Sequence, residues 1–252
     1  MDHQLITLCI LSIVGCFTGI VDTIGGGGGL IALPVLLGIG LPPTVALGTN
    51  KFQSIFGETM ATFRFVRHGK LDTHHLKFAL IFTGIGGFVG AICVQFIHPA
   101  ILAKLIPFLL LFVLLYTLFT PKLGKEDRKR RIKVFPFYLC FGLGLGFYNG
   151  FFGPATGSFW VFAIMFFLGN NIRYASMHMK PLNLIGNLAS LGCFIYLGNI
   201  NYPIAVVMGA GQLLGARIGS FLVLHKGTQL IRPIFLVVVT VMTIDLLVKN
   251  FG

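Results

Sequence analysis

Residues 134–172 read VFPFYLCFGLGLGFYNGFFGPATGSFWVFAIMFFLGNNI, a run of 39 residues without Asp, Glu, Lys or Arg. A helix needs about 20 predominantly apolar residues to cross a bilayer, so this run is long enough for two hydrophobic segments. Residues 181–216, 23–50 and 78–103 form further uncharged runs of 36, 28 and 26 residues. These runs lack the alternation of polarity over about ten residues that is typical of a membrane barrel strand. They therefore predict a polytopic, all-α membrane protein.

The composition excludes several other classes of protein. Of the 252 residues, 56% are hydrophobic and 10% are charged, whereas soluble globular domains carry about 25% charged residues. The same figures exclude a disordered chain, and the 33 glycines do not follow the G-x-y period of collagen. The five cysteines form no CxxC motif and no Cys/His zinc spacing. We therefore expect an integral membrane protein without a metal or cofactor.

The net charge of +12 is concentrated in one place. Seven of the nineteen basic residues lie at 122–133, KLGKEDRKRRIK, between two hydrophobic halves. Such a stretch is typical of a cytoplasmic loop that follows the positive-inside rule, and binding of anionic lipid headgroups is the alternative. A nucleic-acid-binding protein spreads its basic residues over a face or stripe. We therefore expect the lipid bilayer, and no nucleic acid, as a partner.

The two halves of the chain align when the sequence is shifted by 129 residues. This shift places Lys51 on Lys180, and near the start of each half a shift of 127 places Asp22 on Asn149. The shared register indicates a duplicated unit. The chain therefore divides into a first membrane repeat at 1–120, a basic linker at 121–133 and a second membrane repeat at 134–252.

Each half contains five hydrophobic segments, of which the second is short for a full crossing. The expected segments are 4–24, 29–41, 44–66, 75–97, 100–120, 134–152, 156–169, 172–197, 203–224 and 229–248. The turn at 67–77 is basic, whereas its counterpart at 197–203 holds no Lys or Arg. Since basic loops stay on the cytoplasmic side, these equivalent turns lie on opposite sides of the membrane. We therefore expect a helical bundle of two inverted repeats, with about eight to ten membrane segments and a site at their interface.

Glycine-rich stretches interrupt the helices at equivalent places in the two halves. They read TIGGGGGLIALP at 23–34 and GFYNGFFGPATGSFW at 146–160. A broken helix in a membrane leaves backbone N–H groups free, and the N-terminus of the following helix favours an anion. The alternative is close helix packing through small residues. The candidate anion-binding residues at these breaks are Gly27, Gly28, Gly29, Gly153 and Thr156.

A polar stripe at helical spacing recurs in both halves. In the first half Lys51, Ser54 and Glu58 occupy positions i, i+3 and i+7, and the second half repeats this spacing. Two lysines that face each other across a symmetry axis form an electropositive pocket for a small oxyanion. The alternative is that both lysines snorkel from helix ends to water. The candidate binding residues of the stripe are Asn50, Lys51, Ser54, Lys180, Asn183 and Asn187.

Two carboxylates lie beside these features. Glu58 is either a proton-coupling group or the ion-pair partner of Lys51, and we favour the ion pair. Asp22 flanks the first glycine break, where it either caps a helix or takes part in proton coupling. The sequence contains neither HExxH nor G-x-S-x-G, and it has few acidic residues from which to build a catalytic pair. We therefore expect that the protein is not an enzyme.

Three stretches resemble the signature segments of the sulfite exporter TauE/SafE family. They are GGGGGLIALPVLLGIGLPPTVALGTNKFQS at 25–54, GFYNGFFGPATGSFW at 146–160 and HMKPLNLIGNLASL at 178–191. Ala155 departs from the family's Gly-Pro-Gly-Thr-Gly motif at its middle glycine. The resemblance implies a multi-pass permease of the bacterial inner membrane for small sulfur-containing anions such as sulfite, thiosulfate or organosulfonates. It points to Asn50, Lys51, Lys180, Asn183, Asn187 and the two glycine breaks as binding residues.

Together these features predict a secondary transporter that exports a small anion by alternating access. Its expected partners are the anion and coupling protons, with Glu58 and Asp22 as the candidate coupling residues. The alternatives are a membrane subunit or scaffold that does not transport, and a passive anion channel. Assembly into a homo-oligomer is also left open.

Overall fold

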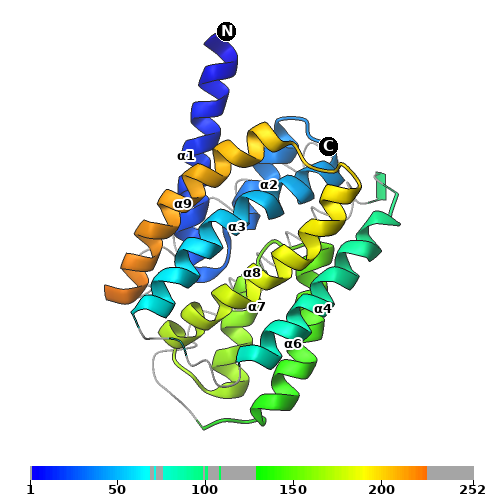
Figure 1. Ribbon diagram of the computed structural model, residues 1–252. Helices are drawn as coiled ribbons and strands as arrows, with labels where there is room; N and C mark the ends of the chain where they lie inside the picture. The colour runs from blue at the N-terminus through cyan, green and yellow to red at the C-terminus, as the bar shows by residue number, and fades with distance from the viewer. Residues whose placement is uncertain are drawn as a thin grey trace.

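The computed structural model describes residues 2–68, 71, 76–98, 100, 101, 108 and 129–225. Within these ranges all regular structure is helical, which confirms the predicted all-α class, and the helices form one elongated bundle (Figure 1). The helices are α1 (Asp2–Gly25), α2 (Gly28–Gly38), α3 (Pro43–Arg67), α4 (Leu76–Gln95), α6 (Val134–Phe151), α7 (Thr156–Ala163), α8 (Ile172–Tyr196) and α9 (Tyr202–His225). A π-helical turn, η1 (Ile164–Leu168), follows α7 directly.

When α7 and η1 are taken together, these helices begin and end within three residues of eight of the expected segments. The agreement arises because uncharged runs and glycine or proline breaks set the helix bounds. The segment expected at 229–248 lies outside the described residues, and so do 121–128 of the linker. The segment expected at 100–120 does too, apart from 100, 101 and 108. The total of eight to ten membrane segments therefore stays a prediction.

Four helices of the described part are long and apolar enough to cross a membrane. They are Ile6–Gly25, Leu76–Gln95, Val134–Phe151 and Tyr202–His225. Large apolar side chains project outward from them, for example Ile13, Ile81 and Leu214, which are all more than half exposed. An outer surface of this kind suits lipid rather than water. The protein is thus a helical membrane protein.

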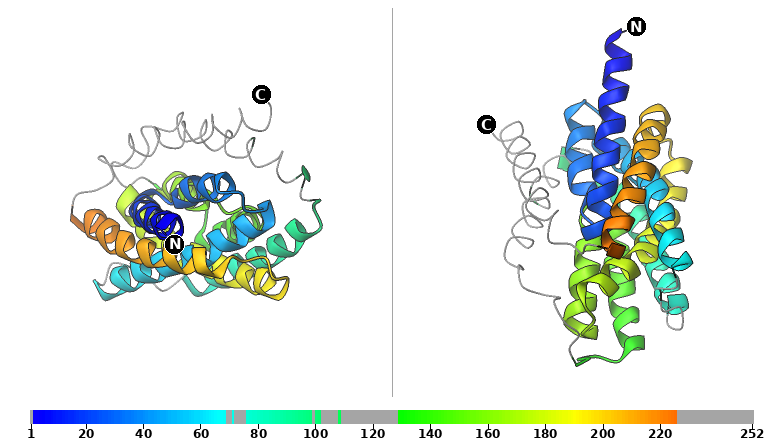
Figure 2. Two further views of the ribbon diagram at one scale, coloured as in Figure 1. Left: turned by 90° about the horizontal axis from the view of Figure 1, so that it is seen from above. Right: turned by 90° about the vertical axis from the view of Figure 1, so that its left-hand side faces the viewer.

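Helix partners are exchanged between the two halves of the chain. α1 packs along α9, and α4 packs along α6, so the first helix of each half lies on the fourth helix of the other. Close approach depends on glycine: a Cβ at Gly215 would overlap the carbonyl of Cys16, and one at Gly90 would overlap the carbonyl of Phe147. In the side view of Figure 2, α1 and α2 occupy the upper part of the bundle, and α6 and α7 occupy the lower part.

α3 and α8, which carry the two polar stripes, lie against each other inside this arrangement. α3 also packs on α9, and α8 packs on α4. The stripe residues are therefore covered by neighbouring helices, and most of the polar side chains of α3 and α8 are buried.

The two breaks fall between α1 and α2 and between α6 and α7. Gly26 and Gly153 adopt φ values of +71° and +96°, which glycine reaches without steric cost. Ala155 has φ 63°, although it carries a Cβ. The residue that departs from the family motif thus occupies a left-handed conformation that favours glycine.

Candidate functional site

The two breaks meet at the centre of the bundle. The hydroxyl of Ser158 donates a hydrogen bond of 2.6 Å to the carbonyl of Gly25, and the hydroxyl of Ser176 donates one of 2.9 Å to that of Ile24. The backbone of Gly26 lies so close to Gly157 that neither position accommodates a Cβ. The end of α1 is therefore attached to the start of α7 and to α8.

Lys180 on α8 bonds to the first break. Its ammonium lies 2.6 Å from Oδ2 of Asp22, and the pair is buried, with Lys180 0% and Asp22 7% exposed. The other carboxylate oxygen, Oδ1, accepts the backbone N–H of Gly28 at 3.3 Å, in the first turn of α2. The helix-capping role of Asp22 is thereby confirmed.

Lys51 on α3 bonds to the second break. Its ammonium donates a hydrogen bond to the main-chain carbonyl of Asn149, near the end of α6. Its Nζ also lies 5.9 Å from the ring centroid of Phe194, within the range of a cation–π contact. Asn149 in turn donates from Nδ2 to the carbonyl of Asn183 at 3.3 Å. Lys51 thus attaches α3 to the other half of the chain.

The prediction that Lys51 and Glu58 form an ion pair is wrong. Glu58 accepts a hydrogen bond of 2.9 Å from Nδ2 of Asn187 at its Oε2. Lys51 and Glu58 are seven residues apart, which is about 10 Å along a helix. Each therefore has a nearer partner on the other half of the chain.

The snorkelling alternative for the two lysines is also wrong. Lys51 is 1% exposed and Lys180 is 0% exposed. Both ammonium groups bond to acceptors inside the protein. Both side chains therefore point into the bundle and not toward water at a helix end.

The other predicted residues lie around this network. Oδ1 of Asn50 accepts from Gln53 at 3.0 Å, and Oγ1 of Thr156 donates to the carbonyl of Gly153 at 2.6 Å. Asn183 is 4% exposed, and its Oδ1 has no hydrogen-bond partner. The remaining predicted residues are Ser54, Gly27 and Gly28, which are buried, and Gly29, which is half-buried.

The polar contacts follow the duplication. Lys180 bonds to Asp22, and its counterpart Lys51 bonds to Asn149, the counterpart of Asp22. Glu58 and Asn187, which bond to each other, are themselves counterparts under the shift of 129. The network is therefore equivalent in position in the two halves but unequal in charge.

The sequence-based list of site residues missed three groups. Asn149 was available from the repeat alignment, which places it on Asp22. Ser158 and Ser176 were not, because their acceptors are carbonyl groups of α1 more than 130 residues away. Sequence spacing identifies residues on one helix face but not their partners on another helix.

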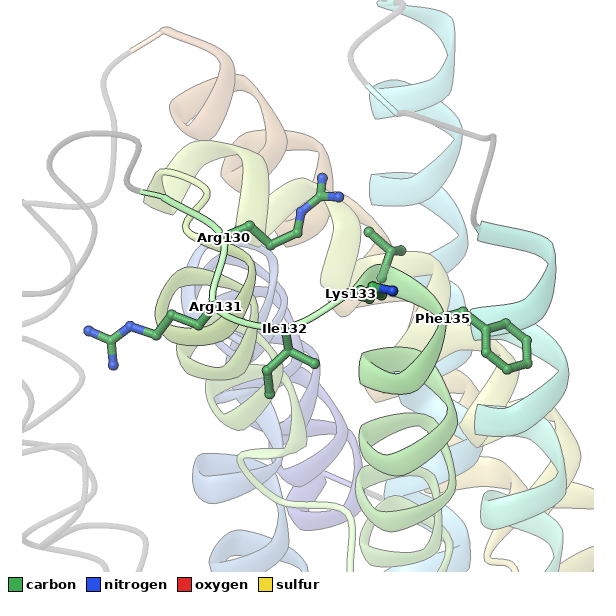
Figure 3. Close-up of a pocket in the computed structure, with 6 residues that line it drawn as sticks. Arg130, Arg131, Ile132, Lys133 and Phe135 are labelled. Carbon is green, nitrogen blue, oxygen red and sulfur yellow. The ribbon is translucent and has the colours of Figure 1, made fainter.

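A separate pocket lies where the basic linker meets α6 (Figure 3). It is lined by Arg130, Arg131, Ile132, Lys133, Val134 and Phe135. The guanidinium of Arg131 lies 4.0 Å from the ring centroid of Phe166. The main-chain N–H of Arg131 donates a hydrogen bond of 2.8 Å to the main-chain carbonyl of Phe167. Val134 begins α6 and Asn149 lies near its end, about 22 Å further along the axis. The pocket is therefore separate from the polar network, and headgroup binding there stays a prediction.

Comparison with known families gives a match over nearly the whole chain. The sequence model of the family described as sulfite exporter TauE/SafE matches residues 11–246. This range includes both breaks, both polar stripes and the basic linker. The resemblance noted from the signature segments is thus confirmed.

Several curated proteins are similar along most of their length. A Haemophilus influenzae protein named probable membrane transporter protein is 44% identical over 247 residues, covering 96% of this chain and 95% of the relative. Probable membrane transporter protein YfcA of Escherichia coli K12 is 42% identical, with coverage of 97% and 91%. A Methanocaldococcus jannaschii protein with a similar name, probable membrane transporter protein MJ0441, is 30% identical, with coverage of 85% and 86%.

Proposed function

This chain belongs to the TauE/SafE sulfite exporter family, and we propose that it is a secondary transporter that exports small sulfur-containing anions. Sulfite, thiosulfate and organosulfonates are the proposed cargo, and the proposal includes no catalytic step. The names of the relatives support membrane transport, and the family description supports a sulfur anion and outward movement.

The observation that carries the proposal is the burial of two lysines in the middle of a helical membrane protein. Charged side chains within a membrane are costly and are retained where they serve a substrate or ion pathway. Lys51 and Lys180 both bond to a residue at a helix break, Lys51 to Asn149 and Lys180 to Asp22. Asn50, Ser54, Asn183, Asn187 and Thr156 supply polar groups that orient the oxygens of an anion.

We also propose that the two halves are inverted repeats that work by alternating access. The exchanged packing of α1 on α9 and α4 on α6 supports this arrangement. So does the bond between Glu58 and Asn187, since a group near a two-fold axis meets its own counterpart. Rocking of one repeat against the other then opens the central site to one side at a time.

The proposed location is the bacterial inner membrane, with the linker at 121–133 in the cytoplasm. An interior-negative potential drives an anion outward, at about 2.3 kcal/mol per charge for each 100 mV. Proton coupling through Glu58 or Asp22 is the alternative source of energy, because both carboxylates lie inside the network.

Flux in proteoliposomes tests the proposed function. Purified protein is reconstituted, and uptake of radiolabelled sulfite, thiosulfate and methanesulfonate is measured with and without an imposed potential or pH gradient. We expect saturable flux that responds to one of the gradients. Flux that does not saturate indicates a channel, and flux equal to that of empty liposomes supports the non-transporting subunit.

A further inference from the structure

At the first break, a carboxylate of the protein itself occupies the place of an anionic ligand. The carboxylate of Asp22 bonds to the ammonium of Lys180 through Oδ2 and to the backbone N–H of Gly28 through Oδ1. A lysine from the polar stripe and an N–H at a helix start thus bind a small anionic group together. At this break the cation is compensated within the protein.

The second break has the same cation but lacks the internal anion. The position equivalent to Asp22 is Asn149, which has a neutral side chain, and Lys51 bonds only to its main-chain carbonyl and approaches the ring of Phe194. The amide of Asn183 faces the same break, because its Nδ2 lies 2.9 Å from the place of a Cβ at Gly157. Two donors therefore converge on a break where no carboxylate bonds directly to the lysine.

Building on the proposed function, we infer that Lys51 contacts the transported anion and that this anion carries a single negative charge. Lys180 is then a positioning residue. Its ion pair with Asp22 stabilises the conformation of the first break. An anion that approaches Lys180 must displace a buried carboxylate. One that approaches Lys51 displaces a neutral carbonyl, which is a weaker acceptor for an ammonium.

The charge balance of the network argues for a singly charged anion. The charged groups around Glu58 are Asp22 from α1, Lys180 from α8 and Lys51 from its own helix. The net charge of these three groups and Glu58 is zero when Glu58 is ionised and +1 when Glu58 is protonated. A single negative charge brings the buried site to −1 or 0, whereas a double charge brings it to −2 or −1. Since uncompensated buried charge is costly, the singly charged anion is favoured in either state of Glu58.

Transport of methanesulfonate by matched variants tests this assignment in proteoliposomes. Methanesulfonate is singly charged at neutral pH, and thiosulfate, which is doubly charged, serves as the competitor. The variants are Lys51→Gln, the neutral pair Asp22→Asn with Lys180→Gln, and Asn149→Asp, which gives Lys51 an internal carboxylate. Lys51→Arg keeps the charge and serves as the reference for folding, which is checked by thermal unfolding in detergent.

We expect Lys51→Gln and Asn149→Asp each to raise the KM for methanesulfonate at least about tenfold. The KM of the neutral pair should stay at least about tenfold below that of Lys51→Gln. We expect thiosulfate to inhibit the flux of labelled methanesulfonate only weakly. The concentration of thiosulfate needed for a given inhibition should be at least about tenfold higher than that of unlabelled methanesulfonate.

Two results overturn the inference while leaving transport intact. In the first, the double variant Asp22→Asn with Lys180→Gln is folded, but its KM for methanesulfonate rises as far as that of Lys51→Gln. Both lysines would then contact the anion. In the second, wild-type protein carries thiosulfate in preference to methanesulfonate. Wild-type protein without saturable flux of sulfite, thiosulfate or methanesulfonate overturns the proposed function itself, and the inference with it.

Discussion

Ala155 shows how a single residue stores strain at the second break. Its φ of 63° places a Cβ in the left-handed region, at a cost of about 1–2 kcal/mol relative to a relaxed conformation. Gly153, two residues earlier, also has a positive φ, so the backbone between α6 and α7 adopts the left-handed region twice. The turn persists because Thr156 and Ser158 hold it through hydrogen bonds to Gly153 and Gly25.

Replacing Ala155 by glycine should stabilise the protein. We expect the free energy of unfolding of Ala155→Gly to rise by about 1 kcal/mol, because the strain is relieved. The measurement is the Tm of purified protein in detergent. Ala163→Gly is the matched control, since Ala163 has φ −60° in a helical conformation and should lose stability. A fall in Tm for both variants would contradict the strained turn.

Glu58 offers a test of proton coupling at a single carboxylate. A glutamine at position 58 still accepts the hydrogen bond from Asn187 but cannot release a proton. If Glu58 carries the coupling proton, Glu58→Gln abolishes the response of anion flux to a pH gradient while the protein stays folded. Glu58→Asp keeps a titratable group and is the control. A Glu58→Gln variant that responds to the gradient like wild type excludes this role.

Sequence reasoning at this scale identified the polar residues but not how they pair. Lys51 and Lys180 could be predicted as site residues because the same polar spacing recurs at equivalent positions of the two halves, each beside a long uncharged run. The pairing of Lys51 with Glu58 was wrong because it considered one helix only. The actual partners, Asn149 and Asn187, lie on the other half of the chain, and only the helix packing brings them near.

At the scale of elements, the paired helices depend on glycine at their contact lines. A Cβ at Gly90 on α4 would overlap the carbonyl of Phe147 on α6. Gly144, on the same α6, has nothing within 4 Å of the place where its Cβ would lie. An alanine at position 90 therefore tests the contact between α4 and α6, whereas an alanine at position 144 tests helix propensity alone.

Alanine at these two positions should have opposite effects on stability. We expect Gly90→Ala to lower the free energy of unfolding by about 1–3 kcal/mol, because α4 and α6 must move apart. Gly144→Ala should leave it unchanged or raise it by up to about 1 kcal/mol, through better helix propensity. Thermal unfolding in detergent measures both. Equal losses in the two variants would mean that α4 and α6 do not pack along this line.

The helix bounds could be predicted because each depends on local signals. Uncharged runs, the glycine clusters and prolines such as Pro42 and Pro43 set where helices begin and end. The contact between the two breaks could not be predicted. It depends on Ser158 and Ser176 reaching carbonyl groups of α1, which is a contact between distant parts of the chain.

At the scale of the whole molecule, the proposal of inverted repeats makes a claim about sidedness. His68 directly follows the last residue of α3 and Leu197 directly follows that of α8, and the shift of 129 places one on the other. In inverted repeats these equivalent helix ends face opposite sides of the membrane. In parallel repeats they face the same side.

Labelling of single cysteines distinguishes the two topologies. In a variant whose native cysteines are replaced by serine, we expect a membrane-impermeant maleimide to label Leu197→Cys from outside intact cells. His68→Cys should react only after the cells are opened, because its turn is basic and cytoplasmic. Both side chains are exposed at the end of their helix, so accessibility within the protein is matched. Labelling of both from the same side would contradict inverted repeats.

The most direct test of the central claim is anion flux through the protein with and without its two buried lysines. Wild type and the double variant Lys51→Ala with Lys180→Ala are reconstituted at equal amounts, after thermal unfolding shows that both are folded. We predict saturable uptake of labelled sulfite, thiosulfate or methanesulfonate by wild type and none above empty liposomes by the double variant. Undiminished flux in the folded double variant would contradict a binding site built on these lysines.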